Sequence, residues 1–190
     1  MFGYLTEMLK WSLVAAPIFL LCRFCYWQIT AKNQKINWYH EIALLLLVCY
    51  LVGVGSITMN WYSLALSVAS GNFGADFSSI NLVPFRQIFA YGGLSDGFAV
   101  MNLLGNILLF VPVGFLVVLL WQQRHPLVAG ALVALAFSLL IEFVQLFSLR
   151  GTDIDDVILN TAGGLVGAVI CVLIKQLVPK LSAKYISKKS

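Results

Sequence analysis

The sequence predicts an all-α fold: a polytopic transmembrane helical bundle of about five spans, with a long outer loop that is partly re-entrant or interfacial. Of the 190 residues, 61% are hydrophobic and only 11% are charged, whereas a soluble domain carries roughly 25% charged residues. The apolar residues are gathered in runs of about 18 to 24, the length that crosses a ~30 Å hydrocarbon core as a helix. These runs do not alternate between apolar and polar positions, so they do not fit a transmembrane β-barrel.

The expected spans cover residues 9–27, 42–61, 98–121, 127–148 and 155–178. Tryptophan residues lie near several of their ends, as in the aromatic belt at a membrane interface. No change of composition divides the chain, so residues 1–190 are expected to form a single transmembrane domain. The outer loop, residues 62–97, is too long for a simple connector. It is apolar at intervals and broken by glycines and Pro84, so part of it is expected to lie on the outer leaflet or dip into it.

The lysine and arginine residues predict the orientation of the bundle. With five spans, nine of the twelve fall on the side that holds the first and third connections and the C-terminus. An excess of Lys and Arg marks the cytoplasmic side of a membrane protein. The N-terminus and the long loop are therefore expected outside the cell, and the C-terminus in the cytoplasm.

Polar residues inside the apolar runs gather at one end of the expected bundle. They lie near the start of the third span, the end of the fourth and the start of the fifth. Because successive helices alternate in direction, these positions share the outer end, and the helical spacing puts each set on one face. With two arginines of the outer connections they form the candidate ligand-binding set: Arg86, Asn102, Asn106, Glu142, Gln145, Arg150, Asp153, Asp156 and Asn160.

Glu142 is the most informative of these residues. A charged group in hydrocarbon costs about 2.5–3.5 kcal/mol on insertion scales and normally faces the bundle interior or a cavity. A buried Glu142 must be protonated or matched by a donor, such as Arg86, Arg150, Asn102 or Asn106. Two interpretations stay open: a hydrogen bond between helices that holds the bundle together, or a part of a functional site.

The acidic residues at the start of the fifth span have three interpretations. Acids in the first turn of a helix cap its exposed N–H groups, but Asp153, Asp155 and Asp156 exceed what capping needs. Asp153 and Asp156 are suited to hold a divalent cation such as Mg²⁺ against a lipid diphosphate. Alternatively, they act with Arg150 and bind a charged ligand directly by hydrogen bonds.

Glycines indicate close helix contacts within the bundle. Gly163 and Gly167 of the fifth span have the spacing that lets two helix backbones approach each other. The same interpretation is extended to Gly105 and Gly114 of the third span.

Five segments of the sequence resemble motifs of the VanZ family of bacterial membrane proteins. They read NLVPF (81–85), NLLGNILLFVPVGF (102–115), SLLIEFVQ (138–145), RGTDIDD (150–156) and NTAGGLVG (160–167). The matching region, residues 81–167, is the VanZ-like motif core, and the first two spans carry no recognisable signature. The family's namesake is linked to low-level resistance to teicoplanin, a lipid-tailed glycopeptide that acts outside the cell. The resemblance implies no catalytic role for any residue.

Together the residues and the resemblance favour a non-enzymatic envelope protein in the bacterial cytoplasmic membrane. It would bind an amphipathic ligand at the outer leaflet, either teicoplanin-like or a lipid-linked wall precursor, and confer low-level antibiotic resistance. Its partners would be this ligand and membrane lipids, with no cofactor and no nucleic acid. One alternative is a membrane enzyme acting on a lipid phosphate or amide, with Glu142 as acid or base and Mg²⁺ on the aspartates. Another is a lipid transporter, which requires a polar path to the inner side, where the sequence offers little.

Overall fold

The computed structural model describes residues 2–29, 36–59, 61–71, 74–86, 97–148, 151–179 and 185. Within these ranges the chain forms six α-helices, a short 3-10 helix and one isolated β-bridge. The α-helices are α1 (Phe2–Ile29), α2 (Trp38–Thr58), α3 (Trp61–Ala69), α5 (Gly97–Leu120), α6 (Pro126–Gln145) and α7 (Ile154–Leu177). All of them except α3 are long and apolar enough to cross a membrane. The prediction of an all-α, multi-pass membrane protein is confirmed.

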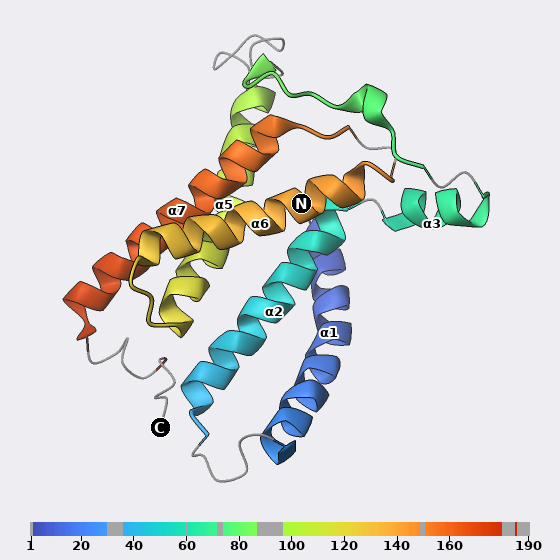
Figure 1. Cartoon of the computed structure of the whole chain (residues 1–190). Coiled ribbons are helices and arrows are strands. Elements are labelled where there is room, and N and C mark those ends of the chain that lie inside the picture. The colour runs from blue at the N-terminus through green and yellow to red at the C-terminus, as the bar shows by residue number, and fades with distance from the viewer. Residues whose placement is uncertain are drawn as a thin grey trace.

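The five long helices are arranged as a three-helix group and a hairpin (Figure 1). Within the group, α7 packs along α5 in the most extensive helix contact of the described chain, and α6 packs against both. The hairpin of α1 and α2 joins this group through α2, which contacts α5. No residue in the apolar window of α1 is fully buried, because α1 lies at the edge of the bundle and packs mainly on α2.

Apolar side chains between these helices form three buried clusters. One joins α2, α5 and α6, a second joins α2 to the C-terminal half of α5, and a third joins α5 to α7. Their buried members are Val54, Met59, Phe110, Val113, Ala134 and Ile141; Ala43, Leu47, Val117 and Leu120; and Val118, Ala168 and Cys171. Lipid tails are as apolar as these side chains, so the clusters stabilise the bundle by van der Waals packing.

Glycines permit the close approach of α5 and α7. A Cβ atom added to Gly167 would overlap the carbonyl oxygen of Val111, and one added to Gly114 would overlap that of Gly164. Small residues at such positions let helix backbones come together, so the packing role predicted for these glycines is confirmed. For Gly105 the prediction is wrong, because an added Cβ atom would meet nothing within 4 Å.

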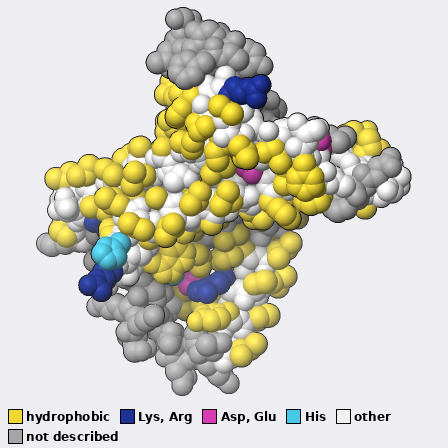
Figure 2. All heavy atoms as spheres, turned by 45° about the horizontal axis from the view of Figure 1, so that its top comes forward, with side chains coloured by type: hydrophobic (Ala, Val, Ile, Leu, Met, Phe, Trp, Pro, Cys, Tyr) yellow, Lys and Arg dark blue, Asp and Glu magenta, His cyan; other side chains and the backbone are white. Residues whose placement is uncertain are grey.

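The outer surface of the helices is apolar (Figure 2). Leu13 of α1 is 73% exposed, Leu108 of α5 is 66% exposed, and the other long helices also expose large hydrophobic side chains. Soluble monomers rarely expose contiguous apolar patches larger than a few hundred Å². A surface of this kind fits contact with lipid tails, in agreement with the length and composition of the helices.

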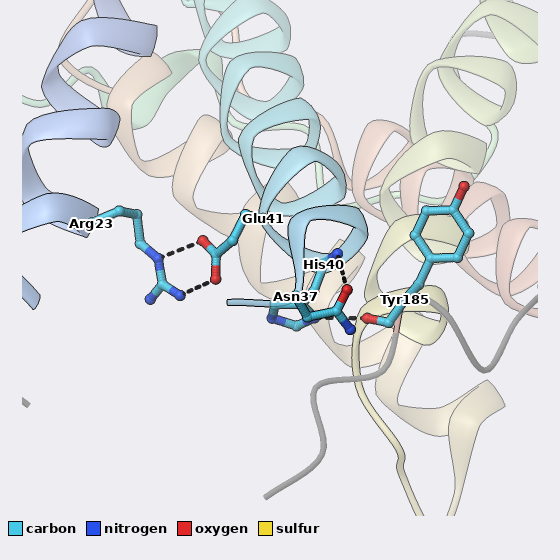
Figure 3. Close-up of polar contacts among 5 residues, drawn as sticks. All are labelled: Arg23, Asn37, His40, Glu41 and Tyr185. Atoms are coloured by element: carbon cyan, nitrogen blue, oxygen red, sulfur yellow. Dashed lines mark hydrogen bonds and ion pairs between the residues drawn. The ribbon is translucent and has the colours of Figure 1, made fainter. Parts of the chain in front are cut away.

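One end of the bundle is fixed by contacts around the first turn of α2, and we call it the His40 end (Figure 3). Arg23 of α1 forms an ion pair with Glu41, in which its Nε lies 2.8 Å from Oε2. The Arg23 guanidinium also lies 4.8 Å from the centre of the Tyr26 ring. Nδ1 of His40 donates to the backbone carbonyl oxygen of Tyr185 at 2.8 Å. Residue 185, beyond the end of α7, is thus held against α2.

The segment between α2 and α5 contains α3 and the 3-10 helix η1 (Phe77–Ser79). Asp76 caps η1: its Oδ1 accepts from the Ser78 hydroxyl at 2.6 Å and from the Ser78 backbone N–H at 3.0 Å. These bonds favour the ionised form and hold the pKa of Asp76 below its ordinary value. The N–H of Asp76 donates to the carbonyl oxygen of Leu146, 2.9 Å away, which fixes the segment to the end of α6. Its re-entrant or interfacial position stays a prediction.

Candidate functional site

The ends of α2 and α6 meet at the end of the bundle opposite His40. The side-chain nitrogen of Gln145, the last residue of α6, donates to the carbonyl oxygen of Thr58, the last residue of α2, at 3.0 Å. Carbonyl groups in the last turn of a helix have no partner within that helix. Gln145 is only 3% exposed, so this hydrogen bond satisfies a carbonyl that water reaches poorly and joins the two helix ends.

Asp153 is the N-cap of α7 and connects this helix to α6 and to the outer loop. Its Oδ1 accepts from the backbone N–H of Asp155 at 3.0 Å and from the side-chain amide of Asn81 at 2.9 Å. Its own N–H donates to Oε2 of Glu142 at 3.0 Å. Glu142 is 4% exposed and Asp153 is 7% exposed. The Glu142 carboxylate thus accepts from a backbone N–H, and the side-chain donors that the sequence suggested for it stay a prediction.

Asn81 joins the outer loop to the start of α7. Its N–H donates to the carbonyl oxygen of Thr152 at 2.8 Å, and its carbonyl oxygen accepts from the N–H of Ile154 at 3.0 Å. These two bonds form the isolated parallel bridge between Asn81 and Asp153. The Asn81 side chain also accepts from the N–H of Val83 at 3.2 Å. Residues 81–86 are therefore fixed over the first turn of α7.

Asp155 holds the next part of this loop in an uncommon backbone conformation. Phe85 has a φ of 61°, in the left-handed region that residues with a bulky side chain rarely adopt. Its N–H donates to Oδ1 of Asp155, which is 4% exposed. The other oxygen, Oδ2, is buried and has no hydrogen-bond partner in the part of the chain described here. Residues in such conformations persist only where surrounding contacts fix them, and Asp155 supplies one of these contacts.

Two side-chain hydrogen bonds join α7 to its neighbours deeper in the bundle. Nδ2 of Asn106 on α5 donates to Oδ1 of Asp156 at 2.5 Å, and Nδ2 of Asn160 donates to Oγ of Ser138 on α6 at 2.9 Å. Asn160 and Ser138 are buried, and Oδ1 of Asn160 has no partner among the residues described. Asp156 and Asn160 are one helical turn apart, so polar groups continue along α7 into the apolar part of the bundle.

We call the residues of these contacts the polar network: Asn81, Asn106, Ser138, Glu142, Gln145, Asp153, Asp155, Asp156 and Asn160. The network includes six of the nine residues that the sequence suggested as ligand-binding. Of the other three, Arg86 is exposed in the outer loop, and Asn102 is exposed on α5 one turn from Asn106. Arg150 lies outside the described residues.

Three members of the polar network were absent from the predicted set. Ser138 precedes Glu142 by one turn, and Asn81 opens a segment that resembles a family motif. The position of each residue in the sequence therefore indicated a possible place in the site. Asp155 was assigned to the acidic run without a role of its own. The contact between Asn81 and Asp153 joins residues 72 positions apart, and no local pattern indicates such a pairing.

The polar network contains both carboxylates of the cation site that the sequence suggested, Asp153 and Asp156. Carboxylate oxygens are the ligands that Mg²⁺ prefers, so the chemistry of these two side chains fits a cation. However, each of them already accepts a hydrogen bond from an asparagine amide. Over the described ranges there is no group of three or more His, Cys, Asp or Glu residues that could hold a metal ion. The cation site at Asp153 and Asp156 stays a prediction.

Comparison with known proteins identifies the family. The model of the VanZ/LLP1 family matches residues 41–175, a range that contains the whole polar network. Protein VanZ of Enterococcus faecium is 34% identical to this chain over 90 residues, which are 47% of this chain and 50% of that protein. The alignment thus spans about half the length of that relative, and no solved structure matches the chain. Because the family model covers well over half of the sequence, the chain belongs to the VanZ/LLP1 family.

Proposed function

We propose that this VanZ/LLP1 protein binds an amphipathic ligand at the outer leaflet of the bacterial cytoplasmic membrane and confers low-level antibiotic resistance without catalysing a reaction. The ligand would be a lipid-tailed glycopeptide such as teicoplanin, or a lipid-linked wall precursor. The observation that carries this proposal is the polar network itself, which gathers buried carboxylates and amides at one end of an otherwise apolar bundle. Membership of the family supports a resistance-related role.

The chemistry of this end suits a ligand with a polar head and an apolar tail. Binding sites for such molecules combine a few fixed polar groups with apolar walls. Arg86 is an exposed cation in the outer loop at this end of the bundle. At the same end of the bundle, Met101 near the start of α5 is 75% exposed and Phe143 in the last turn of α6 is 57% exposed. A lipid tail could lie along these side chains while its head meets the Arg86 cation.

The distribution of charge supports an outer location for the polar network. Among the described cations, Arg23, Arg124 and Lys175 lie toward the His40 end, whereas Lys10 and Arg86 lie toward the end with the polar network. The side richer in Lys and Arg is expected to face the cytoplasm. The polar network would then face the compartment in which glycopeptides act.

The test measures protection and binding with the same variants. Asn106→Ala and Asp156→Ala remove the contact between α5 and α7 at the polar network, and Asn102→Ala is the matched control, an exposed asparagine one turn away. We expect the first two to lower teicoplanin resistance in a susceptible host and to reduce binding of labelled teicoplanin or lipid II to purified protein. Asn102→Ala should leave both unchanged. Equal resistance and equal binding in all three, at equal membrane levels, would contradict the proposal.

The enzyme alternative has one observation in its favour, the buried Glu142 carboxylate beside Asp153. It predicts that purified protein converts labelled lipid II, that EDTA stops the conversion if Mg²⁺ takes part, and that Glu142→Gln retains binding but loses turnover. Product formation of this kind would replace the binding proposal.

A further inference from the structure

The loop turn over α7 exposes apolar side chains and a cation within five residues. Leu82 is 70% exposed, Val83 56% and Phe85 40%. Arg86 is also exposed and forms no ion pair with any described residue. Its N–H donates to the carbonyl oxygen of Val83 at 3.3 Å, which closes the turn. We call residues 82–86 the loop turn.

This turn is held rigidly although it lies at the surface. Asn81 anchors its start through the bridge to Asp153, and the buried Asp155 carboxylate accepts from the N–H of Phe85. Phe85 is kept at a φ of 61°, a conformation that costs a residue with a side chain about 1–3 kcal/mol unless its surroundings impose it. Strain of this kind is concentrated at functional sites. A surface turn that served only as a connector would not need it.

We infer that the loop turn recognises the phosphate head group of a lipid. Arg86 would bind the anionic oxygens, and Leu82, Val83 and Phe85 would contact the first part of the tail. This inference rests on the proposed function and narrows its ligand to a lipid-linked phosphate or diphosphate. Asp155 is a positioning residue in it, because it sets the backbone of Phe85 and touches no ligand atom.

Charge and geometry support a phosphate over other head groups. A guanidinium presents its donors in a planar fork that matches two phosphate oxygens. The carboxylates of Asp153 and Asp155 lie behind the turn, are buried, and accept N–H groups of the loop and of the helix start. They are therefore directed away from a ligand at the surface, where Arg86 is the exposed charge. A fixed turn also loses less conformational entropy when it binds a ligand. This advantage favours the binding of one defined lipid and has little effect on contact with bulk phospholipid.

The inference is tested with the full chain in phosphatidylcholine nanodiscs and two probes that share one tail, geranylgeranyl diphosphate and geranylgeraniol. We expect the diphosphate to bind at least tenfold more tightly, since charge-assisted hydrogen bonds to a phosphate are about twice as strong as neutral ones. Arg86→Gln should lower the affinity for the diphosphate about tenfold and leave the binding of geranylgeraniol unchanged. Arg86→Lys should lower the affinity for the diphosphate by a smaller factor. Arg124→Gln, an exposed arginine at the opposite end, is the matched control and should change neither.

The positioning role of Asp155 has its own readout. Glycine adopts a φ of 61° without strain, so in a Phe85→Gly background the turn no longer depends on Asp155. Asp155→Ala should therefore weaken diphosphate binding severalfold in the wild-type background and add little to Phe85→Gly. Asp155→Asn, which keeps an acceptor oxygen, should bind nearly as well as wild type. Equal additional losses in both backgrounds would overturn the positioning role.

The remaining outcomes separate this inference from the proposed function. If teicoplanin or lipid II binds but Arg86→Gln binds it equally well, and both probes bind alike, the phosphate inference is overturned and the proposed function stands. If inorganic pyrophosphate binds as tightly as the lipid, or if the signal follows the content of anionic phospholipid in the nanodisc, the assignment to a specific lipid is overturned. If no amphiphile binds at all, the proposed function fails with it.

Discussion

The backbone N–H of Asp153 donates to Oε2 of Glu142 at 3.0 Å and thereby joins the start of α7 to the last turn of α6. Both residues are more than nine-tenths buried. Within a membrane protein little water reaches such groups to replace a missing partner. The bond fixes the short connection between the two helices, and the Asp153 side chain can then cap α7 and hold Asn81 in the outer loop.

Removing the Glu142 carboxylate should therefore destabilise the protein. We expect Glu142→Ala to lower the free energy of unfolding by about 1–3 kcal/mol, because a buried N–H group loses an acceptor. Glu142→Gln keeps an acceptor oxygen and should lose less. Thermal unfolding of the detergent-purified protein, followed by tryptophan fluorescence, measures both. Glu7→Gln, which alters an exposed pair with Lys10, is the control; a Glu142→Ala protein as stable as this control would contradict the role assigned to the bond.

The glycine contacts between α5 and α7 predict a sharp difference between two similar substitutions. Gly167→Ala puts a methyl group against the carbonyl oxygen of Val111, so the helices must move apart. We expect a loss of about 1–3 kcal/mol in stability, as for other overpacked positions. Gly105→Ala, in the same bundle, meets nothing within 4 Å and should be neutral or slightly stabilising. Equal melting temperatures for the two variants would show that the helix approach is not fixed by these glycines.

The sequence predicts the helices well because each span is encoded locally, by a run of apolar residues of membrane-crossing length. The predicted starts of the last three spans differ from the observed starts by a single residue. The gathering of Asn106, Glu142 and Asp156 at one end also follows from sequence, since it needs only the alternation of helix direction.

What the sequence does not predict is which atoms meet. Asn102 and Asn106 look equivalent as residues one turn apart, but only Asn106 faces α7 and reaches Asp156. The left-handed conformation of Phe85 and its bond to Asp155 depend on a fold that brings residues 70 positions apart together. Gly105 and Gly163 are both glycines within long apolar helices. Only the packing of the folded bundle shows that Gly105 is exposed and that Gly163 contacts a neighbouring helix.

The ion pair between Arg23 and Glu41 should couple α1 to the rest of the protein. These side chains are 23% and 13% exposed, and α1 has few other fixed contacts because it packs mainly on α2. A double-mutant cycle with Arg23→Ala and Glu41→Ala should give a coupling energy of about 0.5–3 kcal/mol, as for residues in direct contact. The exposed pair of Glu7 and Lys10 is the control and should give about 0.5 kcal/mol or less. Coupling no larger than in this control would mean that the ion pair does not hold α1, which is then fixed by its apolar packing and by the hydrogen bond from Ser12 Oγ to the carbonyl oxygen of Cys49.

The orientation of the bundle decides which compartment the polar network faces, and two exposed positions test it. Gly74 lies in the segment between α2 and α5, and Arg124 lies in the connection between α5 and α6 at the other end. In a variant whose four cysteines are replaced by alanine, a membrane-impermeant maleimide should label Gly74→Cys in intact cells and Arg124→Cys only after permeabilisation. The expected result follows from the excess of Lys and Arg on the Arg124 side. The reverse pattern would put Glu142, Asp156 and the loop turn in the cytoplasm, where a glycopeptide acting outside the cell could not reach them.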